Sequence, residues 1–159
     1  MAFYNGYCPS SNPADTVNFV SAGDGNGFKA GGWGMNKRKT KCPDVCPSHY
    51  IHHSLAYRNK AHGFYANHHL AGNTWENNTS CGNRSNYNML NRKNTFEAID
   101  VPGYDHSLAN NVSWTFTDAS LGGHLINIDP DRITLTNNSF APSVSSVEVT
   151  AEMFVSTSV

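Results

Sequence analysis

The 159 residues include 11 Lys or Arg and 12 Asp or Glu, which gives a formal net charge of −1 at pH 7. This balance excludes a general electrostatic attraction to nucleic acid or to an anionic membrane, and no apolar run approaches the roughly 20 residues of a membrane span. Charged residues make up only 14% of the chain, while Asn, Gly, Ser and His are abundant and Leu is scarce. This composition disfavours a helical bundle and favours a β-rich fold with many tight turns, because Asn and Gly adopt turn conformations easily.

The N-terminal residues and the cysteines indicate little about the compartment. Residues 1–6 lack the basic start and apolar core of a signal peptide. The four cysteines, Cys8, Cys42, Cys46 and Cys81, are too few and too scattered to form a disulfide scaffold. Cys42 and Cys46 are close enough in sequence to pair in an oxidising compartment, and the sequence leaves their redox state open.

A repeat runs through the polar residues. In four segments an apolar residue is followed, after one position, by Asn or His and then by Asn or Ser; the segments are 51–54, 75–78, 108–111 and 135–138. The irregular steps between them are typical of a parallel β-helix, in which each coil adds three short strands and loops vary in length. We expect Asn77, Asn110 and Asn137 to adopt left-handed turns at one corner and to form an inward asparagine ladder, with His53 replacing one rung.

An aromatic column accompanies this repeat. Phe28, Phe64 and Tyr87 occupy equivalent positions of successive coils and should stack inward, since side chains alternate along a strand. The residues that follow them, Lys29, Tyr65 and Asn88, should then lie on one outward face. Such a face is suited to an extended polymer.

The stretches that carry these columns resemble polysaccharide lyase family nine, the group of pectate and rhamnogalacturonan lyases. The resembling segments are 2–6, 21–34, 48–51, 55–60, 63–67 and 86–92, and the resemblance covers about residues 2–140. It implies an all-β fold, a right-handed parallel β-helix. We expect a single partial domain over residues 1–159, with residues 141–159 as a C-terminal tail or cap.

The most specific resemblance is the glycine-rich segment around Lys29, where the family carries its catalytic lysine. By this resemblance the enzyme cleaves uronic-acid-containing pectic polymers by β-elimination. Lys29 would remove the proton α to the uronate carboxylate, and calcium would acidify that proton. A free lysine has a pKa of about 10.4, so the base acts either near depressing cations or at alkaline pH. Gly27, Gly31 and Gly32 are expected to let the sugar approach Lys29 closely.

The chain departs from the family at the metal site. The family's Asp-Asp-Gly-x-Asp cluster would precede Ala2, and Asp15, Asp24 and Asp44 are isolated. We therefore expect the C-terminal part of a catalytic domain, truncated at its N-terminal side, without its calcium ligands and with little activity alone. An exposed N-terminal edge should make this part poorly stable or self-associating, whereas the full-length protein should be a secreted monomer.

Several residues are candidates for contact with an acidic plant polysaccharide. Lys37 and Arg38 belong to the basic run 37–41, which follows the lysine strand and offers charged hydrogen-bond donors for carboxylates. The other candidates, expected on the groove face, are Tyr65, Asn67, Asn88 and Arg92.

Two alternatives remain open. Cys42, Cys46, His49 and His53 superficially resemble a zinc site, although the spacing is not that of a zinc finger and His53 is also expected in the ladder. The second alternative is a non-catalytic carbohydrate-binding or structural β-helix fragment. Release of unsaturated uronides distinguishes this alternative from the lyase.

Overall fold

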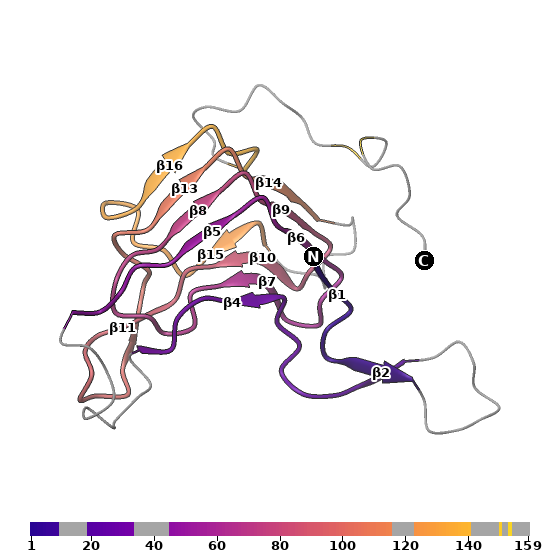
Figure 1. Ribbon diagram of the computed structural model, residues 1–159, viewed down its shortest axis with the longest axis horizontal. Coiled ribbons are helices and arrows are strands. Elements are labelled where there is room, and N and C mark those ends of the chain that lie inside the picture. Colours follow the sequence, from indigo (N-terminus) through magenta and orange to yellow (C-terminus); the bar gives the residue numbers. More distant parts are fainter. Residues whose placement is uncertain (10–18, 34–44, 116–122, 141–149, 151–152, 154–159) are drawn as a thin grey trace.

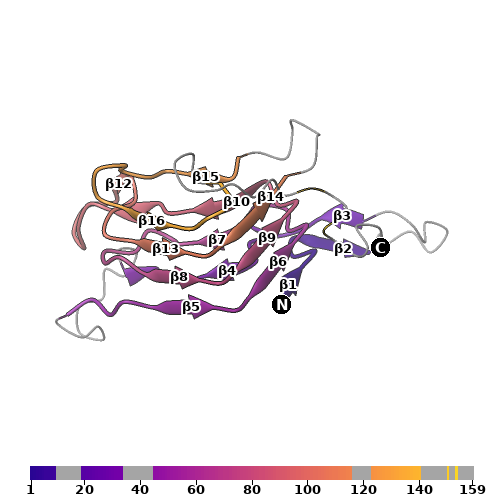
Figure 2. The same ribbon diagram turned by 90° about the horizontal axis from the view of Figure 1, so that it is seen from above.

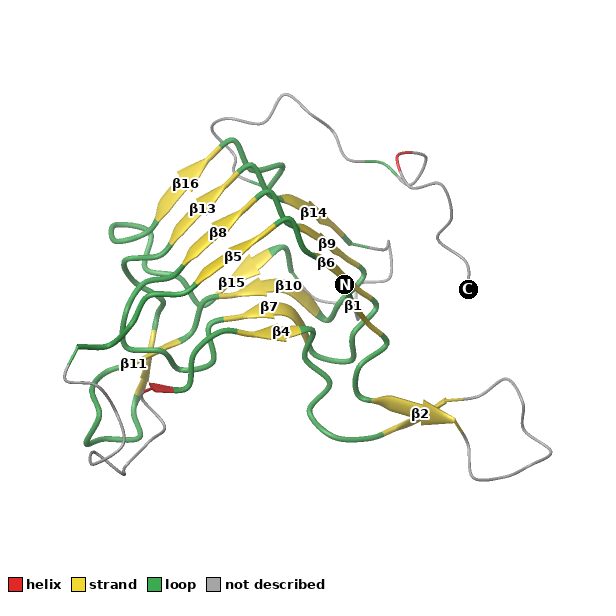
Figure 3. Cartoon of the chain, in the orientation of Figure 1, coloured by secondary structure: helices red, strands yellow, loops and turns green. Residues whose placement is uncertain are grey.

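The computed structural model of the chain describes residues 1–9, 19–33, 45–115, 123–140, 150 and 153. These residues form a coil of short strands stacked in three parallel sheets (Figures 1 and 2). The described part of the chain contains no α-helix, and Figure 3 shows strands joined by loops. No helix within it is long and apolar enough to span a membrane. The predicted all-β class and parallel β-helix are confirmed.

The three sheets are here numbered I to III in the order in which the chain first enters them. Sheet I contains β1 (Ala2–Phe3), β6 (Leu55–Tyr57), β9 (Thr79–Cys81) and β14 (Val112–Trp114). Sheet II contains β4 (Phe28–Lys29), β7 (His62–Tyr65), β10 (Ser85–Asn88) and β15 (Leu125–Ile126). Sheet III contains β5 (Tyr50–His52), β8 (Thr74–Glu76), β13 (Ser107–Ala109) and β16 (Thr134–Thr136). The chain visits the sheets in the order I, II, III in each coil.

Two antiparallel pairs extend from the coil. β2 (Tyr7–Pro9) pairs with β3 (Phe19–Ser21), and β11 (Asn91–Arg92) pairs with β12 (Asp100–Val101). The second pair lies beyond the end of β10, so it brings a loop from a later part of the chain to the end of sheet II (Figure 1). The candidate site uses this pair.

The apolar positions of the repeat are stacked in register in sheet III. Ile51 pairs with Trp75, Trp75 with Leu108, and Leu108 with Leu135. Trp75 and Leu108 are fully buried. The repeat therefore predicted the strand register, because only one register places all four apolar side chains in the core.

The predicted aromatic column is also present. The rings of Phe28 and Phe64 are stacked at 5.1 Å with an interplanar angle of 7°, and those of Phe64 and Tyr87 at 5.1 Å with 12°. Phe140, which the sequence did not single out, extends the column with its ring centroid 5.1 Å from that of Tyr87. Stacked rings of this kind contribute about 0.5–1.5 kcal/mol per pair beyond the area that they bury.

The asparagine ladder exists, but it is one residue later than predicted. His53, Asn77, Asn110 and Asn137 do take the expected left-handed turn, with φ between 48° and 54°, but Asn77, Asn110 and Asn137 are exposed. The residues that form the ladder follow them: Asn78, Asn111 and Asn138 are buried, and the half-buried Ser54 occupies the equivalent position in the preceding coil. The left-handed residue turns its side chain outward, and the next residue begins the new strand pointing inward.

The ladder is built from repeated side-chain to backbone bonds. The backbone N–H of Asn78 donates to Oδ1 of Asn111 at 3.0 Å, and that of Asn111 donates to Oδ1 of Asn138 at 3.0 Å. The Nδ2 group of each asparagine donates to a strand carbonyl, as Asn111 does to Trp75 at 2.9 Å. Each amide thus satisfies backbone groups that the corner leaves without a sheet partner.

Two further polar columns flank this ladder. At the corner between sheets I and II, the backbone N–H of Asn59 donates to Oδ1 of Asn83 at 2.8 Å, and that of Asn5 donates to Asn59. At the start of sheet III, Asn73 accepts from the backbone N–H of His49, and its own N–H donates to His106 Nδ1. The core of the β-helix therefore has polar residues at its corners and apolar columns along sheets II and III, while buried serines, Ser80 and Ser113, line sheet I.

Candidate active site

Lys29 lies at the end of β4 on the outward face of sheet II. It pairs in register with Tyr65 of β7, which in turn pairs with Asn88 of β10. The Lys29 side chain is 42% exposed and its Nζ lies 3.5 Å from Oδ2 of Asp24. The same Nζ lies 6.0 Å from the centre of the Tyr65 ring. The predicted column of Lys29, Tyr65 and Asn88 is therefore present, with an accessible amine at its first position.

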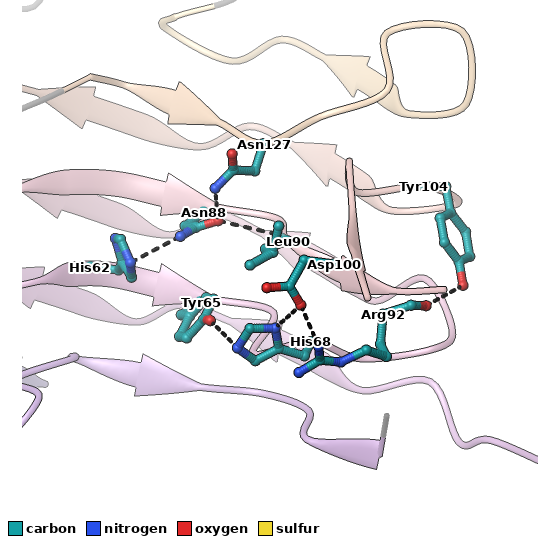
Figure 4. A network of polar contacts seen from close by, with 9 residues as sticks. All are labelled: His62, Tyr65, His68, Asn88, Leu90, Arg92, Asp100, Tyr104 and Asn127. Atoms are coloured by element: carbon teal, nitrogen blue, oxygen red, sulfur yellow. Dashed lines mark hydrogen bonds and ion pairs between the residues drawn. The ribbon is translucent and has the colours of Figure 1, made fainter. Parts of the chain in front are cut away.

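A chain of polar contacts leads from Tyr65 to the second antiparallel pair (Figure 4). The Tyr65 hydroxyl lies 2.8 Å from Nε2 of His68, and Nδ1 of His68 lies 2.6 Å from Oδ1 of Asp100. Asp100 also forms an ion pair with Arg92 at 2.9 Å. Arg92 and Asp100 stand directly opposite each other in β11 and β12. The antiparallel pair thus fixes the carboxylate that orients His68.

Asn88 is held from several directions. Its Nδ2 lies 2.9 Å from His62 Nε2, and its Oδ1 accepts from the backbone N–H of Leu90 and from Nδ2 of Asn127 (Figure 4). These bonds use both polar atoms of the side chain. Asn88 therefore orders the sheet face.

The prediction that these candidates line an open groove face was wrong for three of them. Tyr65 is 9% exposed, Arg92 5% and Asn88 3%. The rings of His62 and His68 both pack against Tyr65 and contribute to its burial. Asn67 is half-buried, with a positive φ of 53°. Only Lys29 among the described candidates has a substantially exposed side chain.

Burial determines the protonation of two of these groups. It raises the pKa of Tyr65, and the negative charge of Asp100 adds to this effect. Burial, together with the charge of Arg84, lowers the pKa of His62 to about 4. His62 is therefore neutral at pH 7, with Nε2 accepting from Asn88 and Nδ1 donating to Ser85. Tyr65 keeps its proton over a wide pH range.

The glycines around Lys29 have a different role from the one predicted. A Cβ on Gly27 would lie 2.5 Å from the carbonyl oxygen of Gly63, and one on Gly31 would lie 2.0 Å from that of Ala66. Both contacts are with the backbone of the next coil. These two glycines are needed because the coils pack closely, so sugar approach does not explain them.

The comparisons with known proteins agree with this architecture. Residues 1–111 match the family model described as Pel9A-like, right handed beta helix region. The chain belongs to this family. One solved structure, a rhamnogalacturonan lyase, is 40% identical over 98% of the chain, with a TM-score of 0.76. The chain spans 34% of the length of that lyase. No match was found among curated proteins.

Membership of the Pel9A-like family confirms the predicted right-handed β-helix and the resemblance on which it rested. Residues 141–159, predicted as a tail or cap, lie almost entirely outside the described residues. So do two of the predicted substrate residues, Lys37 and Arg38, and one of the predicted zinc ligands, Cys42.

The described residues do not fit a calcium or zinc site. No group of three or more His, Cys, Asp or Glu residues among them is arranged to hold a metal ion. Asp24 pairs with Lys29, and Asp100 is shared by His68 and Arg92. Cys46 lies 3.5 Å from His69, which is outside the predicted zinc set, and His53 instead contacts His52.

Sequence reasoning missed His62, His68 and Asp100. The two histidines could have been found from their places in the sequence, since His62 begins β7 and His68 lies three residues after its end. Asp100 had no such signal, because it lies 32 residues after His68 in the sequence and approaches only through the β11–β12 pair.

Proposed function

We propose that this chain forms part of a polysaccharide lyase that cleaves uronic-acid-containing pectic polymers by β-elimination, with Lys29 as the general base. The observation that carries the proposal is the exposed Lys29 amine on the outward face of a β-helix whose solved relative is a rhamnogalacturonan lyase. In the proposed reaction the neutral amine removes the proton α to the uronate carboxylate. The electron pair then forms a double bond as the glycosidic oxygen leaves.

The substrate class follows from the same proposal. An acidic plant polysaccharide carries one carboxylate on each uronate, and cationic side chains of the protein would help to position it. Lys37 and Arg38 remain the proposed partners for such carboxylates. Asn67, half-buried beside the Lys29 strand, is proposed to hydrogen-bond the sugar. A secreted location fits a polymer of this kind.

Calcium is proposed as the cofactor on the family resemblance alone. It would acidify the proton that Lys29 removes, but no step here is assigned to it, since the described residues supply no site. We therefore expect calcium to leave the melting temperature of the 159-residue chain unchanged.

The test follows the ultraviolet absorbance of the unsaturated uronide. The protein, in the longest form that its gene encodes, is mixed with polygalacturonate or rhamnogalacturonan with and without added calcium. Lys29→Ala should abolish turnover. Lys93→Ala is the matched control, because Lys93 is also an exposed lysine paired with a carboxylate, Glu97, at 3.2 Å. It should keep full activity.

Two results would contradict the proposal. Turnover that survives Lys29→Ala would remove Lys29 as the base. If the protein binds an oligosaccharide of either polymer but does not cleave it under any condition, the alternative of a non-catalytic carbohydrate-binding β-helix is supported instead. The wild-type protein and the Lys93 variant should behave alike in both assays.

A further inference from the structure

β-Elimination needs a second proton transfer that Lys29 does not perform. When the bond to the glycosidic oxygen breaks, that oxygen leaves as an alkoxide unless a donor protonates it. A general acid positioned at the leaving oxygen typically contributes 10²–10⁴-fold to the rate. Such a donor must keep its own proton under the conditions in which the lysine base is neutral.

Tyr65 is the group next to Lys29 that meets this requirement. The two residues are paired across adjacent strands, and neighbouring strands of a sheet are about 4.8 Å apart. The Lys29 amine lies 6.0 Å from the Tyr65 ring centre. Tyr65 is 9% exposed, so a sugar bound at the Lys29 amine would reach it only through that exposed part. Burial and Asp100 raise the pKa of Tyr65, which favours the protonated phenol.

We propose that Tyr65 is the general acid of the elimination and that His68, held by Asp100, is the residue that positions its hydroxyl. This proposal rests on the proposed lyase function. Lys29 Nζ takes the proton from the carbon α to the carboxylate, and the C–H electrons form the new C=C bond. The C–O bond to the leaving sugar breaks, and its oxygen takes the proton of the Tyr65 hydroxyl, which gives up its hydrogen bond to His68 Nε2 in this step. The resulting lysine ammonium and tyrosine phenolate exchange their proton through solvent, so no other reactant is consumed.

The contacts of His68 support a positioning role. Asp100 accepts a hydrogen bond from Nδ1–H, so Nε2 faces the Tyr65 hydroxyl at 2.8 Å. Asp100 is itself fixed by Arg92 on the opposite strand. The turn that presents His68 is unusual, because both Asn67 and His68 have positive φ values, 53° and 58°. The same conformation occurs at the structural corners of the coil, as at Asn77, Asn110 and Asn137, and here it fixes the direction of the chain at His68.

The experiment compares two leaving groups. One substrate is the natural polymer, and the other is a synthetic uronide with 4-nitrophenoxide on the carbon that undergoes elimination, which departs without a proton. Tyr65→Phe should lower kcat on the polymer by about 10²-fold and leave KM nearly unchanged. On the nitrophenyl substrate it should keep most of its activity, while Lys29→Ala should lose both reactions.

Variants of the neighbours separate positioning from folding. His68→Ala should lower kcat on the polymer by about tenfold, and His68→Gln, which retains a hydrogen-bonding group toward Tyr65, should recover part of that loss. Tyr50→Phe is the control. It removes a tyrosine hydroxyl that donates to Glu76 on the exposed face of sheet III, away from Lys29.

The outcomes distinguish the two proposals. If Tyr65→Phe reduces both substrates equally, or neither, the assignment of Tyr65 as the acid is wrong while the lyase function stands. If the wild-type protein neither turns over the substrates nor binds oligosaccharide, the lyase function is wrong and the acid assignment falls with it. A KM rise without a kcat loss would make Tyr65 a binding residue only.

Discussion

The shifted asparagine ladder predicts a large difference between two adjacent asparagines. Asn111 is buried, and its Oδ1 accepts from the backbone N–H of Asn78 at 3.0 Å. Its Nδ2 donates to the carbonyl of Trp75 and to Oδ1 of Asn138, each at 2.9 Å. Asn110, one residue earlier, is exposed and has a φ of 54°. Asn111→Ala and Asn110→Gly therefore test the register of the ladder.

The magnitude follows from the bonds that each change removes. Asn111→Ala deletes the two hydrogen bonds donated by Nδ2, of about 1 kcal/mol each, and leaves the Asn78 N–H without its acceptor, which costs about 1–3 kcal/mol. The expected loss is roughly 3–5 kcal/mol, a large part of the 5–15 kcal/mol that stabilises a typical domain. Asn110→Gly should change the free energy of unfolding by no more than about 0.5 kcal/mol, because glycine adopts positive φ freely.

Urea unfolding followed by tryptophan fluorescence measures both free energies. Amide hydrogen exchange gives a local check, since the Asn78 N–H should exchange faster in Asn111→Ala than in the wild-type chain. The reasoning is refuted if Asn110→Gly is as destabilising as Asn111→Ala. It is also refuted if exchange at Asn78 does not respond to the loss of the Asn111 side chain.

Two further predictions concern packing and pH. Gly31→Ala should lower the free energy of unfolding by about 1–3 kcal/mol, because the new Cβ would lie 2.0 Å from the carbonyl oxygen of Ala66. Gly123→Ala is the control: the nearest contact of its Cβ would be 3.4 Å away, so the same urea titration should show almost no change. Burial is the main cause that lowers the pKa of His106 from 6.5 to about 4 in the folded chain. Between these two pH values, therefore, His106 is protonated in the unfolded chain but not in the folded chain. Stability should be greatest above about pH 6.5 and fall by up to about 3 kcal/mol as the pH drops to about 4. His106→Gln should reduce that dependence without abolishing it, because the pKa of His62 is also lowered to about 4. A midpoint that does not change between pH 7 and 4 in the wild-type chain would contradict the prediction.

The sequence by itself determined the repeating architecture. The apolar residues at 51, 75, 108 and 135 specify the register of sheet III, because a shift of one residue would expose all of them. Phe28, Phe64 and Tyr87 likewise specify which face of sheet II is inside, and so place Lys29 outside. These inferences succeeded because a coil repeats the same local environment, and alternation along a strand converts it into a residue pattern.

The tertiary structure alone decided which polar side chains face inward and which groups surround the base. Asn110 and Asn111 have identical side chains. Only the left-handed turn at Asn110 directs the Asn110 side chain outward and the Asn111 side chain into the core. Tyr65 was expected on an open face, but His68 and Asp100 approach it through a turn and an antiparallel pair that no repeat encodes. Repeat patterns predict the contacts between equivalent positions of adjacent coils. Contacts between a coil and an inserted loop depend on how the loop folds back, and that is fixed only when the whole chain is packed.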